Sequence, residues 1–73
     1  MPNHRELKDI VINGGGLILD VSKFTINVLK EIATEAAKNN AFVVCKNISK
    51  LTTTNMKEIA MKSKGHVIFN FCS

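Results

Sequence analysis

Residues 22–33 read SKFTINVLKEIA, and residues 49–60 read SKLTTTNMKEIA, the same pattern 27 positions later. Seven of the twelve positions are identical, and Leu17 and Val44 form a conservative pair upstream in the same alignment. A repeat period of about 20–50 residues is typical of stacked supersecondary units. The sequence therefore predicts two copies of one structural unit.

Each copy begins with a short apolar run, LILDV at residues 17–21 and AFVVCK at residues 41–46, and HVIFNF follows at residues 66–71. Runs of this length that are rich in Val, Ile and Phe are typical of buried strands. Apolar positions at helical spacing lie between them, at Val28, Leu29, Ile32, Ala33 and Ala36, and then at Met56, Ile59, Ala60 and Ser63. This periodicity predicts a helix after each of the first two strands.

The helix boundaries carry recognisable capping residues. Thr25 and Thr52 stand where a hydroxyl can accept a hydrogen bond from the first free backbone amides of a helix. Asn39-Asn40 and Gly65 stand where a helix ends in the left-handed region. Short joints between alternating strands and helices require parallel strands joined by crossovers on one side.

The predicted fold class is α/β, a three-stranded parallel β-α-β-α-β sheet with both crossover helices on one face. The chain makes a single small domain, residues 1–73, with βα units at about residues 17–40 and 41–65 and a final strand at residues 66–71. Leu7, Ile10 and Val11, after a capping box of Asn3 and Glu6, predict a short helix at about residues 4–11. That helix either covers the second sheet face or leaves it open.

The 73 residues carry a net charge of +4, placed unevenly. Residues 1–37 hold four basic and five acidic side chains, whereas residues 38–73 hold six and one. The basic half predicts possible contacts with an acidic partner through Lys46, Lys50, Lys57, Lys62 and Lys64. Nine of the ten cations are lysine, and Trp and Tyr are absent. Since nucleic-acid recognition uses arginine forks and aromatic stacking, a solvated lysine face is the favoured interpretation.

The composition indicates a reducing compartment. Two cysteines, Cys45 and Cys72, make no disulfide framework, and the charged start MPNHRELKD does not resemble a signal peptide. No apolar run reaches the ~20 residues of a membrane span. We therefore expect a cytoplasmic protein without a membrane partner.

Several residues that could carry chemistry have a simpler interpretation. Residues 14–16, a triple glycine, precede a strand and lack a following Lys-Ser or Lys-Thr, which favours a joint over a phosphate loop. Asp20 could be a functional acid at a strand end, but its aligned counterpart Asn47 favours a capped turn for both. The candidate metal ligands His4, His66, Cys45 and Cys72 show no ligand spacing. We expect no metal, no cofactor and no catalytic residue.

Consecutive apolar residues in a strand point to both faces of a sheet, and helices are available for only one face. The residues predicted to form an exposed interface are Ile18, Phe42, Val44, Val67, Phe69 and Phe71. Residues 67–71 also make an uncharged outer strand edge. Either the uncovered face or this edge predicts a homo-oligomer or a protein partner.

The motifs resemble those of two families. Phe42-Val43-Val44-Cys45-Lys46-Asn47 is similar to the L-x-L-x-x-N core of leucine-rich-repeat-like units, which implies a protein-interaction module. LILDVSKFT, a helix, FVVCKNIS, a helix and a last strand resemble the latter two-thirds of a STAS domain, which implies binding of a regulatory partner. The phosphorylated serine motif of that family is replaced here by Thr25-Ile26-Asn27.

The functional hypothesis from the sequence is a small non-catalytic protein-interaction module that self-associates through an uncovered sheet face or edge. The alternative is a nucleic-acid-binding accessory protein that uses the lysine-rich half of the chain.

Overall fold

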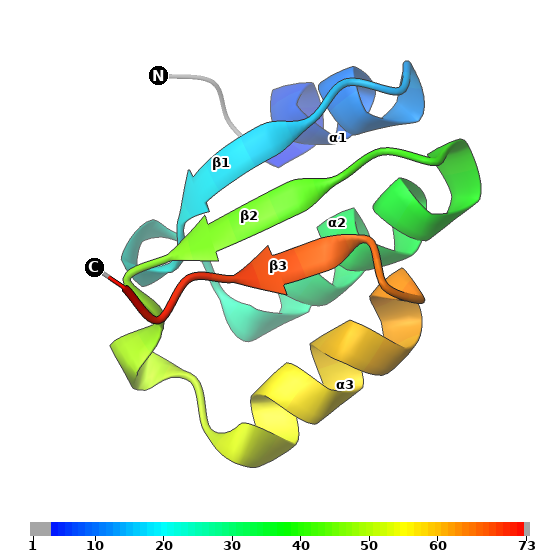
Figure 1. Ribbon diagram of the computed structural model, residues 1–73. Coiled ribbons are helices and arrows are strands. Elements are labelled where there is room, and N and C mark those ends of the chain that lie inside the picture. Colours follow the sequence, from blue (N-terminus) through cyan, green and yellow to red (C-terminus); the bar gives the residue numbers. More distant parts are fainter. Residues whose placement is uncertain (1–3, 73) are drawn as a thin grey trace.

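The computed structural model describes residues 4–72, a three-stranded parallel sheet with three helices (Figure 1). The helices are α1 (His4–Ile12), α2 (Ile26–Asn39) and α3 (Thr53–Ser63). The strands are β1 (Leu17–Asp20), β2 (Val43–Lys46) and β3 (Val67–Phe69), in the spatial order β1-β2-β3, and short 3₁₀ turns follow the first two strands, η1 (Val21–Lys23) and η2 (Ile48–Lys50). The predicted α/β fold with a three-stranded parallel sheet is confirmed.

All three helices lie on one side of the sheet (Figure 1). Helix α2 is central and packs against α1 on one flank and α3 on the other. The N-terminal helix therefore does not cover the second sheet face, which settles the alternative left open by its sequence. Leu7 and Val11 of its apolar stripe are buried, whereas Ile10 remains 42% exposed. Asn3 of the predicted capping box lies outside the described residues.

The core lies between the sheet and the helices. Leu19, Val43 and Cys45 point from the strands into this layer, and the largest helix contributions are Leu29, Ile32 and Ile59. Each of these side chains is at most 4% exposed. Burying a Val, Leu or Ile side chain stabilises a fold by about 1.5–3 kcal/mol, so this layer supplies most of the stability.

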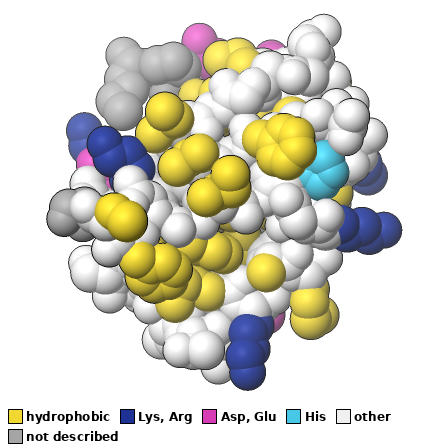
Figure 2. Space-filling view, in the orientation of Figure 1, with side chains coloured by type: hydrophobic (Ala, Val, Ile, Leu, Met, Phe, Trp, Pro, Cys, Tyr) yellow, Lys and Arg dark blue, Asp and Glu magenta, His cyan; other side chains and the backbone are white. Residues whose placement is uncertain are grey.

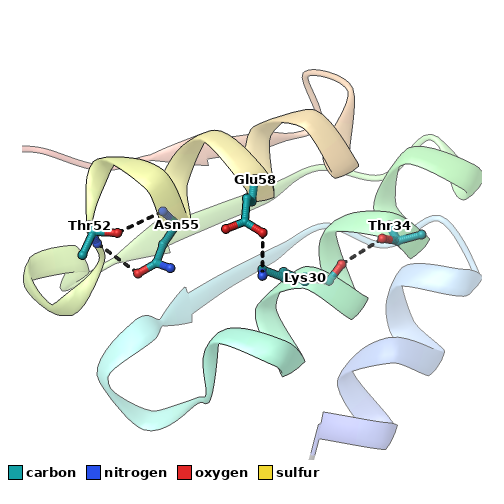
Figure 3. Close-up of polar contacts among 5 residues, drawn as sticks. All are labelled: Lys30, Thr34, Thr52, Asn55 and Glu58. Atoms are coloured by element: carbon teal, nitrogen blue, oxygen red, sulfur yellow. Dashed lines mark hydrogen bonds and ion pairs between the residues drawn. The ribbon is translucent and has the colours of Figure 1, made fainter.

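Side-chain caps begin both crossover helices, as predicted. The amide of Val28 donates to the Thr25 hydroxyl at 3.3 Å, and the amide of Asn55 donates to the Thr52 hydroxyl at 3.0 Å. Asn55 also accepts from the Thr52 amide at 3.1 Å, which completes a capping box at the start of α3 (Figure 3). The C-cap of α2 is Asn40 with φ 57°, and the C-cap of α3 is Lys64 with φ 51°, one residue before Gly65.

The strands and the helices of the two units do not repeat with the same period. Leu17 pairs with Val43, an offset of 26 residues, so the predicted alignment of Leu17 with Val44 is wrong by one residue in the strands. The 3₁₀ turns and the capping threonines keep the offset of 27. Asn47 is the additional residue, and it takes a left-handed conformation with φ 54° between β2 and η2. Asn and Asp tolerate this conformation better than most residues.

Candidate functional site

The uncovered face of the sheet carries a row of three aliphatic side chains. The parallel register places Ile18, Val44 and Ile68 side by side on β1, β2 and β3. Ile18 is 71% exposed and Ile68 is 53% exposed, whereas Val44 between them is partly exposed. These side chains alternate with the buried residues of the same strands, as the pleat of a sheet requires.

An aromatic row lies on the amino-terminal side of this aliphatic row. Phe42 precedes β2, His66 precedes β3, and their rings stack with centroids 4.8 Å apart and an interplanar angle of 26°. A backbone hydrogen bond of 2.9 Å from Val43 to the His66 carbonyl continues the sheet to this position. His66 Nδ1 also lies 2.8 Å from the Ala41 carbonyl oxygen. The two rings are therefore held side by side at the edge of the apolar surface.

A polar row lies on the carboxyl-terminal side. Asp20 pairs with Lys46 in the register, and the amide of Asn70 donates to the Cys45 carbonyl at 2.9 Å, which extends the pairing to Asn70. Lys46 is exposed, and the side chains of Asp20 and Asn70 are partly exposed. The open face thus changes along β2 from aromatic through aliphatic to polar.

Asp20 caps the turn that follows β1. Its carboxylate accepts from the Ser22 amide at 3.0 Å and from the Ser22 hydroxyl at 2.5 Å. The hydrogen bond from the Ser22 side chain, followed by one from the Asn47 side chain, lowers the pKa of this carboxyl below its usual value. A carboxyl held in its ionised form has no proton to donate, so its hydrogen bonds and this pKa shift favour the turn cap over a general acid. Asn47 itself makes no side-chain cap, so the expectation that it repeats the role of Asp20 is wrong.

We call Ile18, Phe42, Val44 and Ile68 the open-face patch. Apolar side chains gather on this face of the molecule in Figure 2, which has the orientation of Figure 1. With areas of ~150–250 Å² for such side chains, their exposed fractions amount to on the order of 400 Å². Apolar patches of a few hundred Å² on a monomer are often functional. The total accessible surface is 4523 Å², so the patch is about a tenth of it.

The structure places the six predicted interface residues in two different environments. Ile18, Phe42 and Val44 lie together on the open face, and Phe71, which follows β3, is 73% exposed. Val67 and Phe69 instead pack, partly buried, against the core. Their assignment to an exposed surface requires correction, because the register β2–β3 turns Ile68 outward in their place. Ile68 and His66 are the members of this surface that the sequence did not single out.

The five lysines of the basic half are all exposed but do not form one surface. Lys46 and Lys50 follow the carboxyl end of β2, and the Lys50 amine donates to the Phe24 carbonyl. Lys57 and Lys62 lie on α3, and Lys64 ends that helix just before the amino end of β3. Because α3 runs back along the sheet, Lys46 and Lys64 are at opposite ends of the molecule.

A groove of about 470 Å³ lies on the helical side and is lined by Lys8, Asn27, Lys30, Glu31, Thr34, Glu35 and Lys62. Its charges are largely compensated. Lys30 contacts Glu58 at 2.8 Å across α2 and α3, and Lys8 lies 3.8 Å from Glu31 (Figure 3 shows the first pair). The hydrogen bond from Lys30 to Glu58 lowers the pKa of that carboxyl. The groove is thus a solvated junction between the helices.

The remaining candidate residues do not converge. Among the described side chains, no group of three or more His, Cys, Asp or Glu could hold a metal ion, and the candidate ligand His4 lies outside that set. Cys45 is buried, which raises the pKa of its thiol to about 11, whereas Cys72 is exposed.

The triple glycine joins α1 to β1, and a Cβ on Gly15 would lie 2.7 Å from Ile10 Cγ2. The close approach of Ile10 therefore explains why a glycine occupies position 15.

Among the described residues, the helices are too short and too polar to cross a bilayer. Comparisons with protein-family models, with curated proteins and with solved structures found no match to this chain. The resemblances to leucine-rich-repeat-like units and to STAS domains therefore stay predictions.

Proposed function

We propose that the protein is a non-catalytic interaction module that self-associates through the open face of its sheet. The observation that carries this proposal is the row of Ile18, Val44 and Ile68, which faces solvent while all three helices cover the other side. Exposing such a row costs hydration free energy that a second apolar surface would recover. Face-to-face packing is the usual way in which one sheet covers another.

The size of the patch predicts a weak and reversible contact. Stable interfaces bury about 800 Å² on each partner, and smaller interfaces belong to transient complexes. The open-face patch reaches on the order of 400 Å², to which His66 and the polar row add contact area. We therefore expect a monomer–dimer equilibrium that depends on concentration. The nucleic-acid alternative is less favoured, because its lysines are spread over both ends of the molecule.

Sedimentation or light scattering from about 1 µM to about 1 mM protein tests the proposal. We expect the mass to rise toward a dimer, and we expect Ile68→Asp to remain monomeric because it places a charge in the aliphatic row of the contact. Met61 is 76% exposed on α3, on the helical side, so Met61→Asp is the matched control. Circular dichroism would check that both variants fold.

A wild-type protein that stays monomeric over the whole range would overturn the proposal. Loss of the dimer in Met61→Asp but not in Ile68→Asp would assign the contact to the helical side and would also overturn it.

A further inference from the structure

The open face is graded along β2, and this gradation bears on how two copies would meet. Phe42, Val44 and Lys46 point outward from one strand at every second residue, so neighbouring rows are ~7 Å apart. Each has a companion on β3 or on the segments next to it, where His66, Ile68 and Asn70 follow in the same order. One end of the face is therefore aromatic and the other is polar and cationic.

We propose that a second copy of the chain docks on this face with its strands antiparallel, about a two-fold axis that passes beside Val44. The inference rests on the proposed function and adds its geometry. A two-fold dimer is the commonest closed assembly, and its contact surface must be complementary to itself. Two orientations of the axis in the plane of contact keep β2 over β2.

An axis parallel to β2 keeps the strands of the two sheets parallel. Each row then meets the same row of the second copy, so Lys46 lies over Lys46 and Phe42 lies over Phe42. Like charges opposed across an interface are strongly unfavourable. Asp20 does little to offset the repulsion between the two lysines, because it lies on β1 and its carboxylate accepts hydrogen bonds from Ser22.

An axis perpendicular to β2 reverses the strands of the second copy. The aliphatic row then meets itself, and Lys46 of each copy lies over the Phe42 ring of the other. A cation over an aromatic face is favourable, and the two-fold axis forms this contact twice. Asn70 then lies over His66, whose ring stacks on Phe42. The aliphatic row meets itself in both arrangements, so charge complementarity and the contact of Lys46 with the Phe42 ring select the antiparallel one.

Site-directed cross-linking tests the arrangement. In a Cys72→Ser background the remaining native thiol, Cys45, is only 2% exposed, so introduced cysteines react alone. The variants are Phe42→Cys, Lys46→Cys and Val44→Cys, and the reagent is a short bismaleimide that spans the ~10 Å between packed sheets. Val44→Cys lies beside the axis and is expected to cross-link with itself.

In the antiparallel dimer, two cysteines at position 42 are separated by ~13 Å along the strands in addition to the sheet spacing, beyond the reagent. We therefore expect a mixture of Phe42→Cys and Lys46→Cys to give on the order of tenfold more cross-linked dimer than either variant alone. Stronger self-cross-linking of Phe42→Cys or of Lys46→Cys would overturn the inference in favour of parallel strands.

Failure of this geometry can be told apart from failure of the proposed function. A wild-type protein that sediments as a dimer while Val44→Cys gives no cross-link would overturn the face-to-face arrangement and assign the contact to a strand edge or to another surface. A wild-type protein that stays monomeric up to about 1 mM would overturn both proposals.

Discussion

The aliphatic rows on the two faces of the sheet have similar side chains but different surroundings. On the covered face, Leu19, Val43 and Cys45 are 4%, 1% and 2% exposed. On the open face, Ile18 and Ile68 are 71% and 53% exposed, although their side chains are equally apolar. The difference teaches that residue type along a strand does not decide burial. The side on which the connecting helices return decides it.

The order β1-β2-β3 explains why the helices are all on one side. Each crossover advances the chain by one strand in the same direction, and crossovers of one hand then place their helices on one face. Helix α1 joins that layer because it packs against α2. The triple glycine that follows α1 then turns the chain into β1. All three helices thus cover one face of the sheet, and the described part of the chain holds no further helix or strand that could cover the other face.

The largest effect is expected from truncating the two faces at adjacent positions of β2. Val43→Ala removes methyl groups from the covered face, where the side chain is 1% exposed, and is expected to destabilise the fold by about 2–3 kcal/mol. Val44→Ala has the same chemistry and a partly exposed site, so we expect less than about 1 kcal/mol, mostly from lower strand propensity. Urea unfolding at low protein concentration, where self-association does not contribute, measures both.

Equal losses in the two variants would contradict the comparison, because they would mean that the outward face is also covered in the folded monomer. A larger loss in Val44→Ala would show that the register of β2 is shifted by one residue.

The reactivities of the two thiols compare the interior of the covered layer with the surface, because Cys45 is buried and Cys72 is exposed. Burial raises the pKa of Cys45 to about 11, whereas Cys72 is exposed. Because the thiolate is the reactive form, we expect Cys45 to react at least ~100-fold more slowly than Cys72 at about pH 8. A colorimetric disulfide reagent should detect one rapid thiol in the native protein and two in urea. Two rapid thiols in the native protein would show that the covered layer opens readily.

Much of the fold follows from local sequence features. The apolar runs predict the three strands, the helical spacing around Ile32 and Ile59 predicts the two crossover helices, and Thr25 and Thr52 predict their first turns. These features depend on interactions within a few residues, such as a hydroxyl that reaches the amide three positions ahead. Local patterns are therefore enough to predict the element order and the parallel sheet.

The residues of the open face are harder to predict, because a strand can turn either its odd-numbered or its even-numbered residues outward. In β3 the residues Val67, Ile68 and Phe69 are all apolar, so no alternation indicates which of them faces outward. Only pairing with Val43, Val44 and Cys45 decides it, and a shift of one residue reverses the result. Asn47 adds one residue between strand and turn, which a repeat of constant period does not anticipate. The sequence also does not decide on which face of the sheet α1 packs, because three successive glycines allow the chain to turn in either direction.

A smaller effect is expected at the cap of α3, the helix that covers β3. Thr52→Ala removes the hydroxyl that accepts from the Asn55 amide at 3.0 Å, whereas the reciprocal bond from the Thr52 backbone amide to the Asn55 side chain can remain. We expect a loss of about 1 kcal/mol in the free energy of unfolding. Thr54→Ala is the matched control, because that side chain is exposed in the first turn, and a change within about 0.5 kcal/mol is expected. Similar losses in both would show that helix propensity, and not the cap, holds this part of the covering layer.

The smallest effect is expected from the ion pair that joins α2 to α3 on the outer side of the covering layer. Lys30 lowers the pKa of Glu58 below its ordinary value of 4.5 by a hydrogen bond of 2.8 Å. A lowered folded-state pKa means that the unfolded chain binds the proton more readily, so the stabilisation is present above pH 4.5 and is lost as the pH falls through the folded pKa. We expect a small difference in urea midpoint between wild type and Glu58→Gln at about pH 7, which shrinks by about pH 3. Asp9→Asn, at an exposed acidic side chain of α1, is the control for general charge effects. A difference that grew as the pH fell would show that the pair opposes folding and that α2 and α3 are held together by their apolar contacts alone.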